Sequence, residues 1–296
     1  MASGRKAARI VTLMTAALTA CTPISVSLLN LGVPRSGYHV VRDLPYGTDP
    51  RQKLDIYVPD GLAAKAPVIL FFYGGFWQSG SKDLYLAFGQ AFASAGIVVA
   101  IADYRLYPQV RYPEFVRDGA GAFAYIQTHV AQYGGDPARI FVAGHSAGAY
   151  IAVMLAADPG WLRAARADPS QVAGVIGISG PYNFLPLRDE NLIAIFGGRD
   201  RPETQPIAHI DGRRPPMLLA TGTADTTVRP RNTADLAAKL EAYGSPVEVV
   251  TYSGVGHIGI ILSLAPGFRG NTTLRQDIID FVRRVSAARF ASPAAQ

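Results

Sequence analysis

The hydrophobic and polar positions divide the chain into apolar runs that alternate with amphipathic stretches. Residues 38–43 and 54–58 alternate apolar and polar side chains with a period of two, which predicts half-buried antiparallel strands. Residues 67–73 form an unbroken apolar run before two glycines, a pattern typical of a strand buried on both faces. Further predicted strands are 97–102, 140–144, 172–179, 216–221 and 247–252.

The amphipathic stretches between these runs predict helices. The predicted helices are 82–94, 113–133, 147–157, 232–243 and 272–288. Buried strands that alternate with helices form a mostly parallel sheet covered on both faces, so we predict an α/β fold with about eight strands. Residues 181–215, rich in Pro, Arg and Asp, interrupt this rhythm. They form either a small lid or an ordinary loop with a short helix.

The composition excludes several classes of protein. Of 296 residues, 49% are hydrophobic and 17% are charged, which excludes a disordered chain, and the 30 glycines follow no collagen-like period. The net charge of +6 falls to +3 without residues 1–20, which hold three cations and no acid. No run of Lys or Arg exceeds two residues, so we expect no nucleic-acid partner. One α/β domain reaches this size.

The amino-terminal segment has the features of an export signal. Three cations precede residues 10–20, an uncharged and mostly apolar stretch of 11 residues that is too short to span a hydrocarbon layer of about 30 Å. Its end, Leu18-Thr19-Ala20-Cys21, resembles the lipobox of bacterial lipoproteins, in which the leader is cut before a cysteine that becomes lipidated. Cys21 is the only cysteine of the chain, so no intrachain disulfide forms.

This resemblance implies a signal peptide over residues 1–20, a lipidated tether over 21–37 and a single domain over 38–296. Two other interpretations are an uncleaved membrane anchor, because residues 10–33 carry no charge, and a cleaved signal of a soluble protein. All three place the domain outside the cytoplasm. The lipoprotein interpretation predicts a location in the bacterial cell envelope, on the periplasmic side, with a membrane contact through Cys21.

A strained turn that exposes a serine is predicted at Gly144-His145-Ser146-Ala147-Gly148. The motif lies between the predicted strand 140–144 and the predicted helix 147–157, which is the context of a nucleophile elbow. Small residues allow the strand and the helix to approach closely in this turn. We therefore predict that Ser146 is a nucleophile and that the side chain of His145 points away from it.

A serine hydroxyl needs a base to take its proton and an anion to orient that base. Of the five histidines, His257 follows the last predicted strand in a glycine-rich loop, as the order Ser…Asp/Glu…His requires. His209 precedes the predicted strand 216–221 and fits this order poorly. Asp225 lies just past that strand, so we predict that Asp225 is the acid and His257 the base.

The loop after the predicted strand 67–73 holds candidate donors for an oxyanion. Gly74 and Gly75 free the backbone to point N–H groups at a carbonyl oxygen as it gains negative charge. The predicted donors are the N–H of Gly75 or Phe76 together with that of Ala147, the residue after the predicted nucleophile.

Aromatic residues near these loops predict an apolar substrate pocket. Trp77 follows the candidate oxyanion hole, and Phe184 and Phe196 lie in the irregular segment 181–215. An equal alternative is that these residues are core under a loop.

Together these motifs resemble the α/β-hydrolase superfamily, within its esterase branch of hormone-sensitive-lipase-like carboxylesterases and arylformamidase relatives. The resemblance covers about residues 38–285. It rests on Gly74-Gly75-Phe76-Trp77, Asp103-Tyr104-Arg105-Leu106, Gly144-His145-Ser146-Ala147-Gly148, Gly222-Thr223-Ala224-Asp225 and Gly256-His257. It implies an α/β-hydrolase fold, a Ser146–His257–Asp225 triad, an acyl-enzyme intermediate, and neither cofactor nor metal. In one departure, Tyr73 stands where the family usually has histidine.

The expected function is a serine carboxylesterase that hydrolyses small to medium carboxylic esters as small-molecule substrates. One alternative is an arylformamidase-type amide hydrolase. The export signal argues against it, because tryptophan catabolism is expected inside the cell. The other alternative is a catalytically silent binding module. The complete set of three candidate catalytic groups argues against that reading, although fold alone does not decide function.

Overall fold

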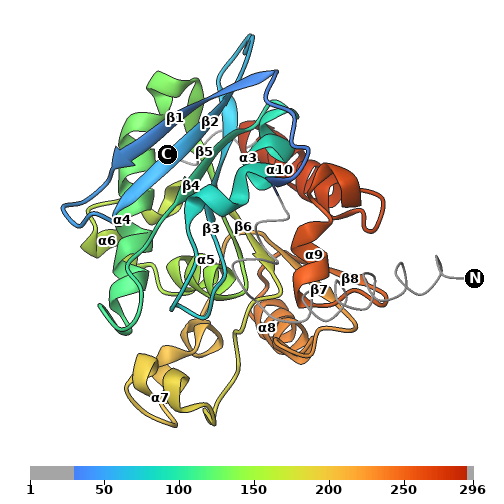
Figure 1. Ribbon diagram of the computed structural model, residues 1–296. Coiled ribbons are helices and arrows are strands. Elements are labelled where there is room, and N and C mark those ends of the chain that lie inside the picture. The colour runs from blue at the N-terminus through green and yellow to red at the C-terminus, as the bar shows by residue number, and fades with distance from the viewer. Residues whose placement is uncertain (1–29, 292–296) are drawn as a thin grey trace, which may run out of the picture.

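The computed structural model describes residues 30–291, which fold around one eight-stranded sheet (Figure 1). The strand order is β1-β2-β4-β3-β5-β6-β7-β8. The pairs β1–β2 and β2–β4 are antiparallel, and every other pair is parallel. The predicted mostly parallel α/β sheet is confirmed.

The strands follow the apolar runs of the sequence closely. Their bounds are β1 Tyr38–Pro45, β2 Lys53–Pro59, β3 Ala66–Phe72, β4 Val98–Ala102, β5 Gly135–His145, β6 Val172–Ile178, β7 Met217–Gly222 and β8 Val247–Tyr252. The strand β5 begins five residues before the predicted run, because its first residues are mostly polar or only half-buried.

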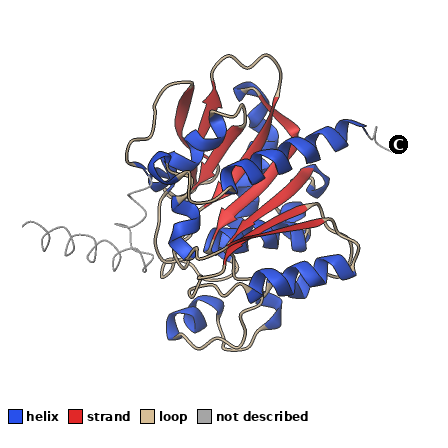
Figure 2. Cartoon of the chain, turned by 90° about the vertical axis from the view of Figure 1, so that its right-hand side faces the viewer, coloured by secondary structure: helices blue, strands red, loops and turns tan. Residues whose placement is uncertain are grey.

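Helices cover both faces of the sheet (Figure 2). Their bounds are α3 Leu86–Ala93, α4 Glu114–His129, α5 Ala147–Ala157, α6 Gly160–Ala164, α7 Glu190–Phe196, α8 Arg231–Ala242, α9 His257–Leu262 and α10 Leu274–Ala291. The helices α3 and α10 contact one another on one face, and α4 packs against α5 on the other. The predicted helix 82–94 begins with a 3-10 turn at Lys82–Tyr85, and α6 and α9 are additional to the prediction. The helix α7 is a short helix within the irregular segment 181–215.

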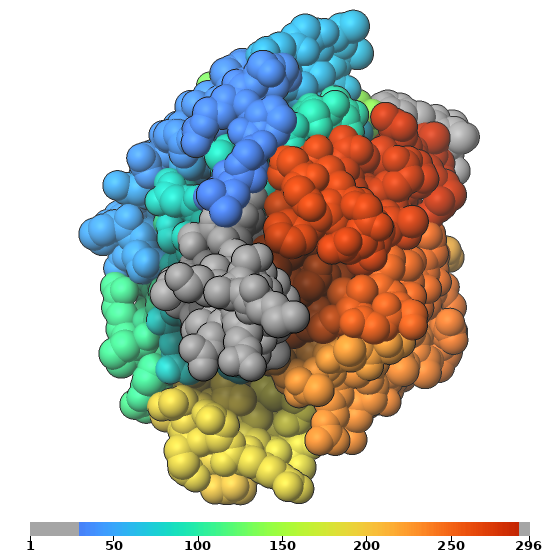
Figure 3. All heavy atoms as spheres, turned by 45° about the vertical axis from the view of Figure 1, so that its right-hand side comes forward, coloured from blue at the N-terminus to red at the C-terminus, as the bar shows by residue number. Residues whose placement is uncertain are grey.

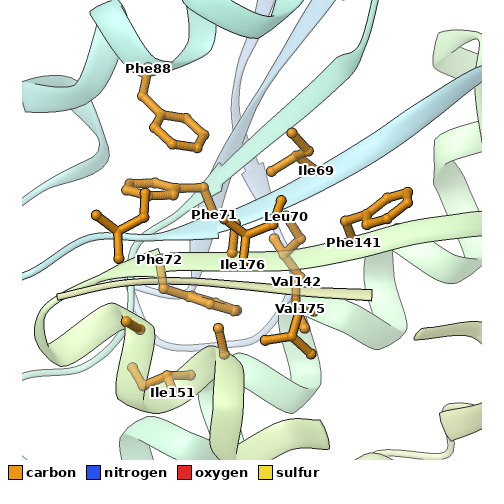
Figure 4. Close-up of a cluster of buried hydrophobic side chains, with 14 of the residues drawn as sticks. Ile69, Leu70, Phe71, Phe72, Phe88, Phe141, Val142, Ile151, Val175 and Ile176 are labelled. Carbon is orange, nitrogen blue, oxygen red and sulfur yellow. The ribbon is translucent and has the colours of Figure 1, made fainter. Parts of the chain in front are cut away.

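The core lies on both sides of β3, because successive residues of a strand point to opposite faces (Figure 4). Phe71 stacks on Phe88 of α3 with ring centroids 3.7 Å apart. Phe72 points to the opposite side, toward Ile151 of α5. All four side chains are buried, so the central strand that ends at the site is held rigidly from both faces.

The strand β2 differs from the prediction, because it is buried on both faces and not on one. Its polar residue Asp55 is fully buried and pairs with Lys82 at 2.9 Å and with Arg42 at 3.0 Å. These two cations compensate the cost of burying a carboxylate. Asp55, a polar position of the alternating pattern, is therefore a buried, ion-paired residue and does not face solvent.

The segment before β1 lies against the domain. The side-chain amide of Asn30 donates to the carbonyl of Asp83 at 2.7 Å, and Val33 is buried in the core. Residues 30–37 of the predicted tether therefore contact the domain. The predicted signal peptide over 1–20 and the predicted lipidation at Cys21 lie outside the described residues. Between residues 30 and 291, no helix is both long and apolar enough to cross a membrane.

Residues 181–215, which we call the cap, contain the short helix α7 and two 3-10 turns. In Figure 3 the cap includes the yellow lobe at one end of the molecule, beside the orange surface to which α8 belongs. The cap thus lies next to the carboxyl ends of the central strands, where sheets of this kind bind ligands.

Candidate active site

The turn between β5 and α5 holds Ser146 in a strained backbone conformation. Its φ of 55° and ψ of −122° lie outside the backbone regions that residues other than glycine usually adopt. A Cβ on Gly148 would lie 2.0 Å from the carbonyl oxygen of Phe72, and one on Gly144 would lie 2.2 Å from Gly148. Only glycine fits either position. The motif therefore has the strand–turn–helix geometry expected of a nucleophile elbow.

The structure brings Ser146, His257 and Asp225 together from three different elements. The Nε2 of His257 lies 2.9 Å from Ser146 Oγ, and its Nδ1 lies 2.8 Å from Asp225 Oδ2. All three residues are buried. By contrast, His209 bonds through its Nε2 to the carbonyl of Glu203 in the cap. The three residues selected from the sequence form one continuous hydrogen-bonded chain.

Hydrogen bonds from His257 and from backbone N–H groups keep the Asp225 carboxylate ionised. Its Oδ1 accepts the N–H of Val228 at 2.8 Å and that of Thr227 at 3.0 Å. Burial raises the pKa of Asp225, but the hydrogen bonds from His257 and Val228 outweigh burial, and the pKa lies below its usual value. An ionised carboxylate fixes the tautomer of His257 with the proton on Nδ1, which leaves Nε2 free to accept the proton of Ser146.

His145 lies beside this chain and holds the backbone of His257. Its Nε2 lies 3.0 Å from the His257 carbonyl, and because a carbonyl only accepts, this nitrogen carries a proton. Burial and the adjacent imidazole of His257 lower the pKa of His145 to about 3, so the ring is neutral at pH 7. The ring of His145 packs against that of His257, with the two ring centroids 4.8 Å apart.

The loop after β3, residues 74–81, comes directly against Ser146. A Cβ on Gly74 would lie 2.8 Å from the Cβ of Ser146, and one on Gly75 would lie 2.1 Å from the carbonyl oxygen of Ser79. Gly75 also has a φ of 137°, which favours glycine. Among the hydrogen bonds within residues 30–291, none uses the N–H of Gly75, Phe76 or Ala147. These donors are available beside the Ser146 hydroxyl.

Tyr73, the departure from the family pattern, anchors both ends of this loop. Its hydroxyl donates to Asp103 Oδ1 at 2.8 Å and accepts from Arg51 Nη2 at 2.7 Å. The same nitrogen of Arg51 donates to the carbonyl of Gly80 at 3.0 Å, and Asp103 Oδ1 accepts the N–H of Lys82. A partly buried network centred on the buried phenol of Tyr73 therefore fixes the loop that carries the candidate donors.

A cavity of about 630 Å³ opens above Ser146 and lies under the cap. Trp77 and Phe184, two of the three predicted pocket residues, line it together with Phe76. Phe196 is not among the lining residues: it is fully buried behind the wall, with its ring centroid 4.9 Å from that of Trp77. For Phe196 the alternative of a core residue is correct, because α7 places it on the inner side of the cap.

Sequence reasoning missed Asn232, which joins the cap to the loop that carries Asp225. Asn232 Oδ1 accepts the N–H groups of Tyr182 and Asn183 at 3.0 and 2.9 Å, and its amide donates to the carbonyl of Arg229. It lies in the first turn of α8, where a polar side chain is common. No local pattern distinguishes a residue that bonds to a segment 50 positions away.

An eight-stranded sheet of this topology, a strained serine between β5 and α5, and a histidine and an aspartate that follow β8 and β7 define the α/β-hydrolase fold. Within this superfamily, the model of the BD-FAE family matches residues 54–240. The chain belongs to the BD-FAE family.

Named relatives agree with this assignment. A probable isoprenylcysteine alpha-carbonyl methylesterase of Arabidopsis thaliana is 31% identical over 86% of this chain. Esterase LipC of Mycobacterium tuberculosis is 30% identical over 73% of it. The chain spans only 60% and 59% of the lengths of these two proteins. Among solved structures, esterase Est2 of Thermogutta terrifontis superposes with a TM-score of 0.69 at 27% identity, covering 88% of this chain and 96% of that one.

Proposed function

We propose that this protein is a serine carboxylesterase that hydrolyses small to medium carboxylic esters through an acyl-enzyme intermediate. The observation that carries the proposal is the chain of hydrogen bonds from Asp225 through His257 to Ser146. The esterase names of its relatives support the same reaction class.

In the first half-reaction, His257 Nε2 takes the proton of Ser146 as Oγ attacks the ester carbonyl carbon. Asp225 stabilises the imidazolium that forms. The N–H groups of Ala147 and of Gly75 or Phe76 bind the oxygen that becomes negative. His257 then returns its proton to the alcohol oxygen, which leaves as the acyl group stays bonded to Ser146.

In the second half-reaction, a water molecule takes the place of the alcohol. His257 removes one proton of the water, and the resulting hydroxide attacks the acyl carbon. The tetrahedral intermediate collapses when His257 protonates Ser146 Oγ, which releases the carboxylic acid and restores the hydroxyl. The same three groups and the same N–H donors serve both steps, so the mechanism needs no residue from outside the described site.

The size and lining of the cavity support small and medium substrates. A volume of about 630 Å³ lies within the range of about 300–1,000 Å³ of small-molecule sites. Phe76 and Phe184 offer aromatic surface to an acyl or alcohol group of moderate length, whereas Trp77 is almost fully buried. We therefore expect short and medium acyl chains to be preferred over long triacylglycerols and peptides.

A substrate panel tests the proposal. We expect the purified protein to hydrolyse 4-nitrophenyl esters of two to eight carbons and to leave long triacylglycerols, peptides and N-formyl amides nearly unchanged. We also expect wild-type protein to react with a fluorophosphonate probe and Ser146→Ala to be inert. Equal labelling of Ser146→Ala would refute the assignment of the nucleophile, and faster hydrolysis of N-formyl amides than of esters would refute the carboxylesterase class.

We also propose that the protein is exported in a bacterium and anchored to a membrane of the cell envelope through lipid on Cys21. The motif Leu18-Thr19-Ala20-Cys21 behind a short apolar segment supports this. Labelled palmitate should enter the wild-type protein and should not enter Cys21→Ala. A mature amino terminus at another residue without lipid would contradict the anchor.

A further inference from the structure

Three arginines line the same cavity as Ser146. They are Arg188 in the cap, Arg229 in the connection from β7 to α8, and Arg231 at the start of α8. All three are exposed, and none of their guanidinium groups makes an ion pair or hydrogen bond with another of the residues 30–291. Elsewhere in the same part of the chain, arginines near acids are paired, as Arg105 is with Asp118.

The acids around these arginines are engaged with other groups. Asp189, the one acidic residue that lines the cavity, accepts the N–H of Leu192 at the start of α7. Glu190 pairs with Arg199, and Asp235 accepts the side-chain amide of Asn183. The lining therefore carries three positive charges against one negative charge. A cavity with such an excess raises the local concentration of anions.

Arg229 and Arg231, on either side of the start of α8, lie on a fixed part of the molecule. The carbonyl of Arg229 accepts both the N–H and the side-chain amide of Asn232, and Arg231 begins α8. Asn232 also holds the first residues of the cap, from which Arg188 follows. The three guanidinium groups are thus carried by two segments that one side chain joins beside the candidate catalytic centre.

We propose that the natural substrate is an ester that carries a carboxylate away from its scissile carbonyl, and that Arg188, Arg229 and Arg231 bind this carboxylate. The inference rests on the proposed esterase activity and adds the substrate class. A guanidinium matches a carboxylate with two parallel N–H donors, a geometry that lysine lacks. One exposed pair contributes little on its own, so recognition depends on the three charges together.

A pair of esters of equal length isolates the effect of the charge. We choose 4-nitrophenyl hexanoate and 4-nitrophenyl hydrogen adipate, which differ in that a carboxylate replaces the terminal methyl group. For wild-type protein we expect kcat/KM for the adipate to exceed that for the hexanoate. Raising the salt concentration should lower the ratio of the two, because ions screen exposed charges.

Glutamine variants then assign the effect to the arginines. Arg188→Gln, Arg229→Gln and Arg231→Gln should each lower the adipate-to-hexanoate ratio about 5-fold, chiefly through KM, and the triple variant should lower it about 50-fold or more. Hydrolysis of the hexanoate should stay within about 2-fold of wild type, which also shows that the variants fold. Arg163→Gln is the matched control, because Arg163 is exposed on α6 and lies outside the cavity lining.

The outcomes separate this inference from the proposed function. If the triple variant keeps the wild-type ratio while hexanoate hydrolysis still depends on Ser146, the arginines do not select the substrate and the inference is wrong. A wild-type preference for the neutral ester overturns it equally. If Ser146→Ala hydrolyses the hexanoate as fast as wild type does, the proposed function itself fails.

Discussion

The two walls of the cavity are built in opposite ways. The wall that holds Ser146, together with the loop 74–81 against it, is packed so tightly that Gly74 and Gly148 leave no room for a single added carbon. The opposite wall, the cap, is a short helix and turns, and most of its cavity-lining residues are half-buried or exposed. Reaction chemistry needs positions fixed to a fraction of an ångström, whereas selection among substrates needs only surface of the right character.

The largest expected effect concerns the tightly packed wall. Asp225→Asn should lower kcat for 4-nitrophenyl butyrate about 10⁴-fold, because an amide favours the wrong tautomer of the base. The Oδ1 that accepts from Val228 is retained, so the melting temperature should change little. Asp211→Asn, an exposed acid before β7, serves as the control and should keep wild-type turnover. Equal losses in both variants would contradict the role of Asp225.

A second prediction measures how little space that wall leaves. Gly148→Ala should destabilise the fold by about 3 kcal/mol, because the new Cβ meets the carbonyl of Phe72 and backbone cannot move away cheaply. Gly267→Ala places a Cβ where no atom lies within 4 Å and should change the free energy of unfolding by less than about 0.5 kcal/mol. Urea denaturation of both variants makes the comparison. Similar stabilities would show that the elbow tolerates expansion.

A third prediction concerns the neutral His145 behind the elbow. Its pKa is about 3 in the folded state and about 6.5 when unfolded, so between these values only the unfolded chain takes up the proton. The stability from its neutral form is therefore present above pH 6.5 and is lost as the pH falls, by about 2 kcal/mol between pH 7 and 5. In His145→Gln, urea denaturation should show a decrease in the free energy of unfolding between pH 7 and 5 that is smaller than in wild type by about 2 kcal/mol. His39 is exposed, so His39→Gln should show the full wild-type loss of stability between pH 7 and 5. The same full loss in His145→Gln would contradict the role given to neutral His145.

The fourth prediction concerns the phenol that anchors the loop 74–81. Tyr73→Phe removes the hydrogen bond to Asp103 and leaves Arg51 with one partner fewer, so the donors of the loop should be held less firmly. We expect kcat for 4-nitrophenyl butyrate to fall about 5-fold with KM nearly constant, a loss of about 1 kcal/mol of transition-state stabilisation, because Asp103 and Arg51 still hold the loop end through Lys82 and Gly80. A change in KM alone would place Tyr73 in substrate binding. Tyr243→Phe, on an exposed ring far along the chain, is the control.

The smallest effect is expected in the cap. Phe184→Ala should lower kcat/KM for 4-nitrophenyl hexanoate about 3-fold relative to the acetate, because the variant removes apolar surface from one side of an open cavity. The turnover of the acetate should stay close to wild type, since the acetate does not reach this surface. Equal losses for both esters would show that the cap positions the catalytic groups and that the two walls are less distinct than their packing indicates.

The same contrast explains what could be predicted from the sequence. The strand runs and Gly144-His145-Ser146-Ala147-Gly148 are predictable because local burial and close backbone approach dictate them. The place of Phe196 is not, because the direction of a side chain in a short cap helix depends on distant packing. The burial of Asp55 is not predictable for a similar reason, since its partners Lys82 and Arg42 are separated from it along the chain. The glycines before His257 predict a loop around that residue, whereas in the structure His257 is the first residue of α9.

The contact of Asn30 with Asp83 limits how far the domain can stand from a membrane. If Cys21 carries lipid, as proposed above, at most nine residue steps separate the anchor from the domain, a span of about 30 Å when fully extended. A tether that reached to β1 would span about twice that distance. Asp83 follows the loop 74–81 that lies against Ser146, so an anchored chain would enter the domain close to the proposed active site. Substrates held at the bilayer surface would then meet the cavity at a concentration far above that in the surrounding solution.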